Sequence, residues 1–437
     1  MALDLTALLA EPLPATTKGL AARAVGRPLA DLGSLGLTLT GGELPFPVAV
    51  LKDSALAHNS AWMRDFCARA GVSLCPHGKT TMAPQLFERQ LADGAWGLTA
   101  ATAAHVRSYR RFGVPRVLLA NQLVGAANVD LVLTELAADP GFDFYTLVDS
   151  EAALAELLAG LARRPIGRPL QVLLELGAPG ARTGVRGREA ALALGRAIRA
   201  AAPAVVLRGI EAYEGVVPGD CEAAVELAAL TLIEQIGDIA AAGVAEGWFA
   251  PGELIVSAGG SQFFDLAAHV LAAVAARPGG PAVRPVLRSG CYLSHDALHY
   301  ERMQARLRQR AGAAWGRGPG LRNALEVWTI VQSVPEPGRA ICAAGKRDLS
   351  HDLMLPQPVG WWPAGEAAPR AVPSGIKTVA LSDQHAWVDA ADGAMPWRVG
   401  DLVGFGVGHP CTTFDRWGLL YTVDDGYRVT GGVRTFF

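Results

Sequence analysis

Short apolar runs alternate with alanine- and leucine-rich helical stretches through the middle of this 437-residue chain. Such alternation implies parallel strands joined by right-handed crossovers, with the helices packed on the sheet. Eight strand–helix units between about residues 72 and 288 fit one closed (β/α)8 barrel. A doubly wound open sheet is the alternative, but no glycine-rich fingerprint follows the first run. The apolar runs are Val72–Cys75, Trp96–Ala100, Val117–Ala120, Phe144–Val148, Val172–Leu176, Val205–Ile210, Leu254–Ala258 and Val286–Arg288.

The sequence changes character after residue 290, where helical periodicity fades and β-rich runs lie between turns rich in proline and glycine. This pattern predicts a compact antiparallel β-domain. The apolar run Val48–Leu51 precedes the barrel and is left over once eight strands are assigned, so we expect it to join the β-domain. The predicted organisation is a helical N-terminal extension at 1–45, a β-domain strand at 46–52, a barrel at 53–289 and the β-domain at 290–437.

Composition and charge argue against several classes of partner. The formal net charge is −2 and no long basic tract is present, so neither nucleic acid nor an anionic membrane is an expected partner. No apolar run approaches the roughly 18 residues of a membrane helix, and the first residues lack the features of a signal peptide. The six cysteines form no CxxC pair and no disulfide pattern, which predicts reduced thiols in a cytoplasmic protein.

The stretch LCPHGKTTMAP at Leu74–Pro84 contains Gly-Lys-Thr, the end of a nucleotide-binding P-loop. A P-loop needs a glycine where Ser73 stands here, and Pro76 removes one of the N–H donors that such a loop uses. Lys79 instead lies just beyond the first predicted barrel strand, at the face where barrels place their active sites. A partly desolvated lysine there can act as an amine nucleophile or base, for example in a Schiff base with pyridoxal phosphate.

Two glycine-containing loops follow the last two predicted barrel strands. SAGGSQ at Ser257–Gln262 follows the seventh strand, and SGCY at Ser289–Tyr292 follows the eighth. Loops at these positions commonly bind phosphate, because glycine lets backbone N–H groups approach the oxygens. Either loop alone is a common feature, but the two together predict a phosphate site on the same barrel face as Lys79.

A histidine and a cysteine lie two positions apart in GHPC at Gly408–Cys411. If this segment is a strand, His409 and Cys411 face the same side and can bind one ion. Imidazole and thiolate ligands together suit zinc, and two protein ligands leave positions open for substrate or water. A lone pair of this kind is more often a buried cysteine beside a structural histidine.

Several of these segments together resemble the D-serine dehydratase/D-threonine aldolase family. That family belongs to the alanine-racemase-like, fold-type III pyridoxal-phosphate enzymes, and the resemblance runs from about residue 45 to the end. It implies a pyridoxal-phosphate barrel, a β-domain built from both ends of the chain, a homodimer, and a zinc or other divalent ion beside the cofactor. The segments that carry it are PHGKT, GARTGV, SAGGSQ, GHPC, CTTFDRW and VDDGYRV.

The resemblance also assigns roles to individual residues. Lys79 would be the lysine joined covalently to the cofactor. Arg182, in GARTGV, would lie near the phenolic oxygen of the cofactor ring, where a fixed cation favours the phenolate. Tyr213 would line the pocket near the ring. The phosphate would be held by Gly259, Gly260, Ser261, Gly290 and Cys291, and the metal by His409 and Cys411.

The activity implied by the resemblance is a lyase that eliminates water from a small D-β-hydroxy amino acid such as D-serine, giving a 2-oxo acid and ammonia. Cleavage of a D-threonine-type substrate to glycine and an aldehyde uses the same residues and stays open. Racemisation, which needs no metal, and a non-catalytic pyridoxal-phosphate-binding protein are further alternatives. Family members often carry a histidine soon after the PHxKT motif, whereas Thr80, Thr81 and Met82 follow here. The substrate of the family members therefore cannot be assigned to this chain from the resemblance.

Overall fold

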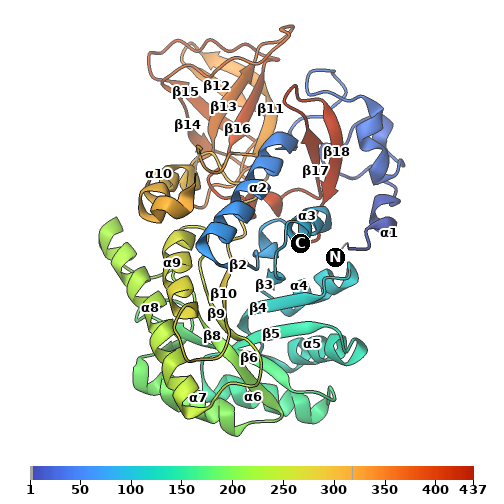
Figure 1. Ribbon diagram of the computed structural model, residues 1–437. Helices are drawn as coiled ribbons and strands as arrows, with labels where there is room; N and C mark the ends of the chain where they lie inside the picture. Colours follow the sequence, from blue (N-terminus) through green and yellow to red (C-terminus); the bar gives the residue numbers. More distant parts are fainter. Residues whose placement is uncertain (1–2, 317) are drawn as a thin grey trace.

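The computed structural model describes residues 3–316 and 318–437. Its described residues form two nine-stranded sheets, one in the barrel and one in the β-domain. In Figure 1 the barrel and its helices lie below, the β-domain lies above, and the blue N-terminal segment lies beside the β-domain. The site described below is formed where the mouth of the barrel meets the β-domain.

The barrel sheet contains eight successive parallel strands in the order β2-β10-β9-β8-β6-β5-β4-β3, which confirms the predicted fold class. The two strands at the ends of this order, β2 and β3, are also connected to each other. A parallel bridge joins His77 to Thr99, and Trp96 N–H donates a hydrogen bond to Leu74 O at 2.7 Å. The short β7 (Val185–Arg186) adds to β6. The eight strands are β2 (Ser73–Leu74), β3 (Leu98–Ala100), β4 (Arg116–Gln122), β5 (Asp143–Val148), β6 (Leu170–Gly177), β8 (Val205–Ala212), β9 (Leu254–Ala258) and β10 (Val283–Leu287).

Helices follow these strands and cover the outside of the barrel (Figure 1). Local sequence fixes where two of them begin: Thr102 and Ser150 each accept a hydrogen bond from the backbone N–H three residues on, as N-cap residues do. The helices are α2 (Asp53–Ala70), α3 (Pro84–Ala92), α4 (Ala103–Arg111), α5 (Ala126–Ala138), α6 (Glu151–Arg163), α7 (Arg188–Ala200), α8 (Glu222–Glu246), α9 (Phe264–Ala275) and α10 (His299–Ala311).

By length and composition alone, α8 could cross a membrane: its most apolar window has a mean hydropathy of 1.5. In the structure 44% of that window is buried, and the helix packs against β8 and α9. One apolar face of α8, including Leu232, Ile233 and Ile236, is therefore buried against the barrel, as expected of a helix that covers a sheet, while Leu227 is exposed.

The β-domain sheet is centred on a strand from the other end of the chain. β1 (Val48–Lys52) pairs antiparallel with β11 (Leu325–Glu336) and parallel with β17 (Leu419–Val423), so this domain includes one parallel pairing. Trp328 on β11 is fully buried and packs on Gly404, where a Cβ atom would lie 2.6 Å from the indole. The other strands are β12 (Arg339–Cys342), β13 (Gln357–Trp362), β14 (Ile376–Leu381), β15 (Ala386–Ala390), β16 (Leu402–Gly406) and β18 (Val429–Arg434).

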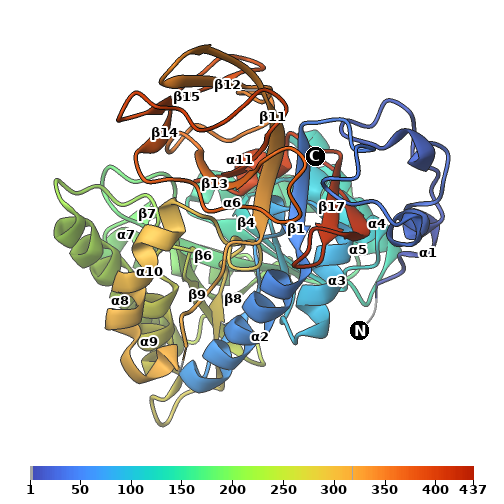
Figure 2. The same cartoon turned by 90° about the horizontal axis from the view of Figure 1, so that it is seen from above.

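The N-terminal segment lies against the outer strand of the β-domain. It contains a four-residue helix, α1 (Thr6–Leu9), and two 3-10 helices, η1 (Ala22–Ala24) and η2 (Leu29–Leu35). η2 packs on β18 with Leu32 fully buried. Further along the chain, α11 (Cys411–Phe414) contacts η3 (Gly78–Thr80) at the mouth of the barrel. This contact brings the C-terminal H-x-C segment to Lys79. Figure 2 looks down on the molecule from above and shows the β-domain and the barrel from that direction.

Candidate active site

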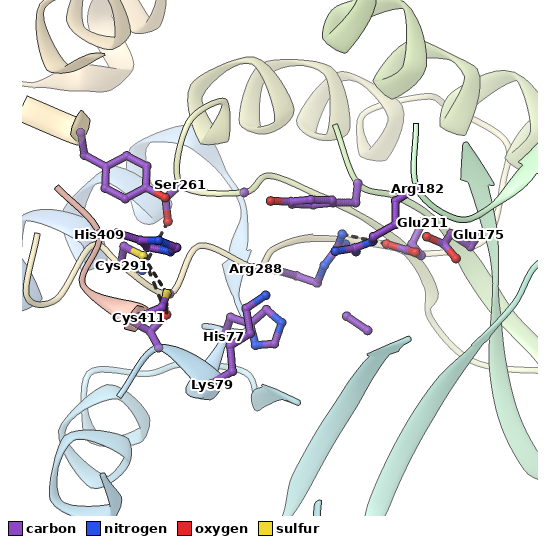
Figure 3. A pocket seen from close by; sticks show the side chains of 16 residues that line it. His77, Lys79, Glu175, Arg182, Glu211, Ser261, Arg288, Cys291, His409 and Cys411 are labelled. Atoms are coloured by element: carbon purple, nitrogen blue, oxygen red, sulfur yellow. Dashed lines mark hydrogen bonds and ion pairs between the residues drawn. The ribbon is translucent and has the colours of Figure 1, made fainter. Parts of the chain in front are cut away.

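A cavity of about 710 Å³, partly open to solvent, lies between the carboxyl ends of the barrel strands and the β-domain (Figure 3). Nine of the ten predicted site residues line it, and the exception is Gly259. Residues more than 300 positions apart in the sequence therefore line the same cavity. The lining residues are His77, Lys79, Thr80, Ala120, Glu175, Arg182, Glu211, Tyr213, Gly260, Ser261, Arg288, Gly290, Cys291, Tyr300, His409 and Cys411.

Lys79 lies in η3, one turn beyond β2, and its side chain lines this cavity. Its Nζ makes no hydrogen bond or ion pair with any part of the chain that the structure describes. The neighbouring His77 is buried, and its Nδ1 has no hydrogen-bond partner among the described residues. Burial, together with the charge of Lys79, lowers the pKa of His77 well below its usual value, so this imidazole stays neutral. The site therefore presents one free amine beside an uncharged ring.

Arg182 lies on the loop after β6, with its guanidinium 4.9 Å from the centre of the Tyr213 ring, which follows β8. Burial raises the pKa of the Tyr213 hydroxyl, and the nearby Glu214 raises it further, while Arg182 opposes the shift. Tyr213 is therefore a neutral hydrogen-bonding phenol with a cation stacked on its face. Both side chains line the cavity, and Figure 3 shows Arg182 near Glu211 and Glu175.

The glycine turn after β9 already binds an anionic side chain. Glu214 is fully buried, and its carboxylate accepts hydrogen bonds from the N–H groups of Gly259, at 3.1 Å, and Gly260, at 2.6 Å. Gly259 does not line the cavity, and its N–H, like those of Gly260 and Cys291, is already bonded within the fold. In the described chain the N–H groups of Ser261 and Gly290 donate no hydrogen bond and remain available to a phosphate.

A buried ion pair that we did not predict forms another wall of the cavity. Arg288, at the end of β10, lies 2.8 Å from a carboxylate oxygen of Glu211 on β8, and it also donates to Ser257 Oγ and Ala212 O. Burial raises the pKa of Glu211 to about 8, although Arg288 opposes that shift. Burial likewise raises the pKa of Glu175 on β6. A charged residue near the carboxyl end of an apolar strand is the sequence signal that could have identified these groups.

Two thiols meet at the side of the cavity that faces the β-domain. Cys291 Sγ and Cys411 Sγ are 3.6 Å apart, and Thr80 Oγ1 lies 3.4 Å from the Cys411 sulfur. The hydrogen bond from Cys291 lowers the pKa of Cys411 to about 7, assisted by Thr80 and Lys79 and opposed by burial. The same hydrogen bond, together with burial, raises the pKa of Cys291 well above its usual value.

His409 does not lie on a strand with Cys411, which corrects the geometry assumed from sequence. β16 ends at Gly406, and Pro410, with helical dihedral angles, starts α11 at Cys411. The turn still places both side chains in the cavity. The His409 Nδ1 lies 2.5 Å from a carboxylate oxygen of Asp352, which leaves Nε2 as the nitrogen free to bind a ligand.

Asp352 is held in place from a second side. Its other carboxylate oxygen accepts a hydrogen bond from Thr412 Oγ1 at 2.8 Å. Burial alone would raise the pKa of Asp352, but the hydrogen bonds from His409 and Thr412 lower it overall. Among residues 3–316 and 318–437, no three His, Cys, Asp or Glu side chains are already arranged to hold a metal ion.

We expect the Cys411 thiol of the metal-free protein to lose its proton as the pH rises through about 7, two units below the ordinary value of 9.0. The thiolate should be followed by its far-ultraviolet absorbance in a pH titration. The signal from Cys411 is the difference between the wild type and Cys411→Ser. A difference signal that titrates only near pH 9 would contradict the assigned hydrogen bond from Cys291.

The chain is similar in sequence and in fold to known proteins. Residues 324–423 match the family model described as "Putative serine dehydratase domain". The chain is 25% identical over 375 residues to a 3-hydroxy-D-aspartate aldolase of Paracoccus denitrificans, covering 84% of this chain and 85% of that protein. It is also 25% identical over 381 residues to a D-threonine aldolase of an Arthrobacter species, covering 87% and 89%. The chain is therefore similar to the D-serine dehydratase/D-threonine aldolase-like proteins.

Solved structures show that the D-serine dehydratase/D-threonine aldolase-like fold extends over nearly the whole chain. A D-threonine aldolase from Filomicrobium marinum superposes with a TM-score of 0.71 at 22% identity, covering 92% of this chain and 97% of that one. D-threo-3-hydroxyaspartate dehydratase from Delftia sp. HT23 gives a TM-score of 0.68 at 22% identity, covering 91% and 99%. An alanine racemase from Bacillus anthracis gives 0.57 at 12% identity, covering 89% and 98%.

Similarity to these proteins supports an enzyme of the lyase kind with pyridoxal phosphate as its cofactor. The residues present fit that cofactor on three observations. Lys79 offers an unpaired amine, Ser261 and Gly290 offer free N–H groups, and Arg182 offers a guanidinium that makes no ion pair within the described chain. Of the other lining residues, Tyr300 at the start of α10 had no signal in the sequence, because its place depends on how that helix crosses the cavity.

Proposed function

We propose that the protein is a pyridoxal-phosphate-dependent, metal-assisted lyase that eliminates water from a small D-β-hydroxy amino acid, with D-serine as the simplest candidate. The products would be a 2-oxo acid and ammonia. The observation that carries this proposal is the meeting, across one cavity, of the free amine of Lys79 with the donors of His409 and Cys411. A homodimer belongs to the same proposal and rests on the family resemblance alone.

Bound pyridoxal phosphate supplies an electron sink for a carbanion at the substrate Cα. Lys79 is the group placed to bind the cofactor and, once the substrate has replaced it, to take the α-proton with its free amine. The neutral His77 beside it helps, because a second cation there would disfavour proton uptake by that amine. Arg182 and Tyr213, which also line the cavity, would orient the ring of the cofactor and exclude water from one of its faces.

The β-hydroxyl is a poor leaving group, and a divalent ion held by His409 and Cys411 would stabilise it as it departs. Asp352 supports this role, since a carboxylate on one imidazole nitrogen orients the other toward a metal. Solved variants of D-threo-3-hydroxyaspartate dehydratase replace a histidine and a cysteine two positions apart, and the cysteine variant is described as metal-free. That description supports a metal at the H-x-C pair of this chain.

Aldol cleavage is the second candidate, and the names of the two sequence relatives favour it. It would begin from the same Lys79 amine and the same His409 and Cys411 donors. The bond that breaks is different: Cα–Cβ is cleaved after the β-hydroxyl loses its proton, and glycine and an aldehyde leave. The visible residues serve both reactions, so the products must distinguish them.

The test is a product assay on purified protein supplied with pyridoxal phosphate and zinc. D-Serine, D-threonine and 3-hydroxy-D-aspartate should each be offered, with the L-enantiomers as matched controls. We expect ammonia and the corresponding 2-oxo acid from at least one D-substrate and none from its L-enantiomer. If glycine and an aldehyde are the main products, the enzyme catalyses aldol cleavage and not dehydration. No turnover of any of them by cofactor-loaded protein would overturn the proposed function.

A further inference from the structure

The H-x-C pair supplies two protein ligands, whereas catalytic zinc sites usually have three and leave the fourth position open. A third protein donor would have to come from another part of the chain that reaches the same point. Cys291 does so: it follows β10 in the barrel, and its sulfur lies 3.6 Å from that of Cys411 in the β-domain. We propose that Cys291 is a second thiolate ligand, so that Cys291, Cys411 and His409 form a Cys₂His site with one open position. This inference rests on the proposed metal-assisted function.

The spacing of the two sulfur atoms fits this assignment. Two thiolates bound tetrahedrally to one zinc ion, each at about 2.3 Å, lie about 3.8 Å apart. The observed 3.6 Å is close to that separation. It is far longer than the roughly 2.05 Å of a disulfide bond, so the thiols are not bonded to each other. The pair is thus already positioned for one ion, and the metal would take the place of the two thiol protons, which leave to solvent.

His409 completes the donor set by a side-chain adjustment. It lines the same cavity as Cys291 and Cys411, although no three-ligand group is preformed in the described chain. The carboxylate of Asp352 holds Nδ1 and thereby directs Nε2 toward a metal. Figure 3 shows the side chains of Cys291, Cys411 and His409 on the same side of the cavity.

Cys291 also connects the metal to the cofactor. Its backbone N–H donates to Ser261 Oγ at 3.3 Å, within the predicted phosphate cradle, while its side chain points to Cys411. One residue would therefore fix the ion relative to the cofactor phosphate. Two thiolates would neutralise a divalent ion, which favours tight binding by soft, zinc-like metals over magnesium.

The test is a cobalt titration of metal-free protein, because thiolate-to-cobalt charge-transfer absorbance grows with the number of thiolate ligands and requires no turnover. Wild type, Cys291→Ser and Cys411→Ser should be compared, with Cys221→Ser, an exposed thiol outside the cavity, as the matched control. We expect Cys291→Ser to lose about half of the charge-transfer intensity and at least tenfold in affinity for cobalt and zinc. Cys221→Ser should match the wild type.

The outcomes separate this inference from the proposed function. If the wild-type spectrum shows a single thiolate ligand and is unchanged in Cys291→Ser, the inference is overturned. The proposed function would still hold in that case, with a metal bound by His409 and Cys411 alone. A two-thiolate spectrum in a protein that turns over no D-amino acid would support the inference and overturn the proposed function. Absence of any metal binding would overturn the inference together with the metal-assisted part of the proposal. Circular dichroism and cofactor content should show that the Cys291 variant still folds and still binds pyridoxal phosphate.

Discussion

Lys79→Ala is expected to lose the visible absorbance of the lysine-bound cofactor and to reduce turnover on the order of 10³-fold or more. The reason is that Lys79 is the one lysine, of five in the chain, that lines the cavity, and the variant has no other amine there to bind the cofactor or to take the α-proton. Absorbance spectra of purified protein titrated with pyridoxal phosphate measure the first effect, and the product assay measures the second.

The matched control is Lys377→Ala, which removes an exposed lysine on β14. Its spectrum and turnover should equal those of the wild type. Because the Nζ of Lys79 makes no hydrogen bond or ion pair in the described structure, its removal should leave the thermal unfolding temperature nearly unchanged. A Lys79→Ala protein that keeps the visible band would show that another group binds the cofactor and would refute the assignment.

His409→Ala is expected to reduce elimination by about 10³-fold, since metal stabilisation of a leaving oxygen contributes several kcal/mol and each 1.36 kcal/mol is a factor of ten. The same variant should still exchange the substrate α-proton with deuterium from solvent. That exchange needs the amine of Lys79 and the cofactor, and no hydrogen bond or ion pair joins Lys79 to His409 among the described residues. NMR of the D-serine α-position in deuterated buffer, beside the product assay, separates the two steps.

The control for this variant is His385→Ala, a histidine of the β-domain that does not line the cavity. It should retain both exchange and elimination. Equal loss of exchange and elimination in His409→Ala would assign the histidine to cofactor binding instead of the leaving group. Full elimination activity in His409→Ala would remove the metal site from the mechanism.

The barrel could be predicted because its strands and helices are indicated by patterns of neighbouring residues. Each of the eight expected runs became a strand, since an apolar segment of strand length between amphipathic helices can be buried only as a central parallel strand. Helix boundaries set by caps, such as Ser150 before α6, were equally local. Val48–Leu51 was expected in the β-domain by elimination, and β1 pairs there with β11 and β17.

The candidate site could be predicted only where a motif fixes chemistry next to a strand end. Lys79 was predicted in this way, whereas Arg182 and Tyr213 were predicted from the family resemblance; all three line one cavity in the structure. Gly259 could not be excluded from sequence, because the carboxylate that occupies its N–H belongs to Glu214, 45 positions away. The ion pair of Arg288 and Glu211 joins two strands, so neither residue shows its partner in the sequence.

The sequence by itself determined the strand–helix alternation, the lysine at the mouth of the barrel and the H-x-C pair, because each depends on neighbouring residues. Only the tertiary structure decided that Cys291 faces Cys411 and that Asp352 orients His409. The contact of Cys291 with Cys411 depends on how the β-domain docks on the barrel, and it joins side chains 120 positions apart. The contact of Asp352 with His409 depends on the folding of the β-domain itself, and it joins side chains 57 positions apart. No local pattern records either proximity.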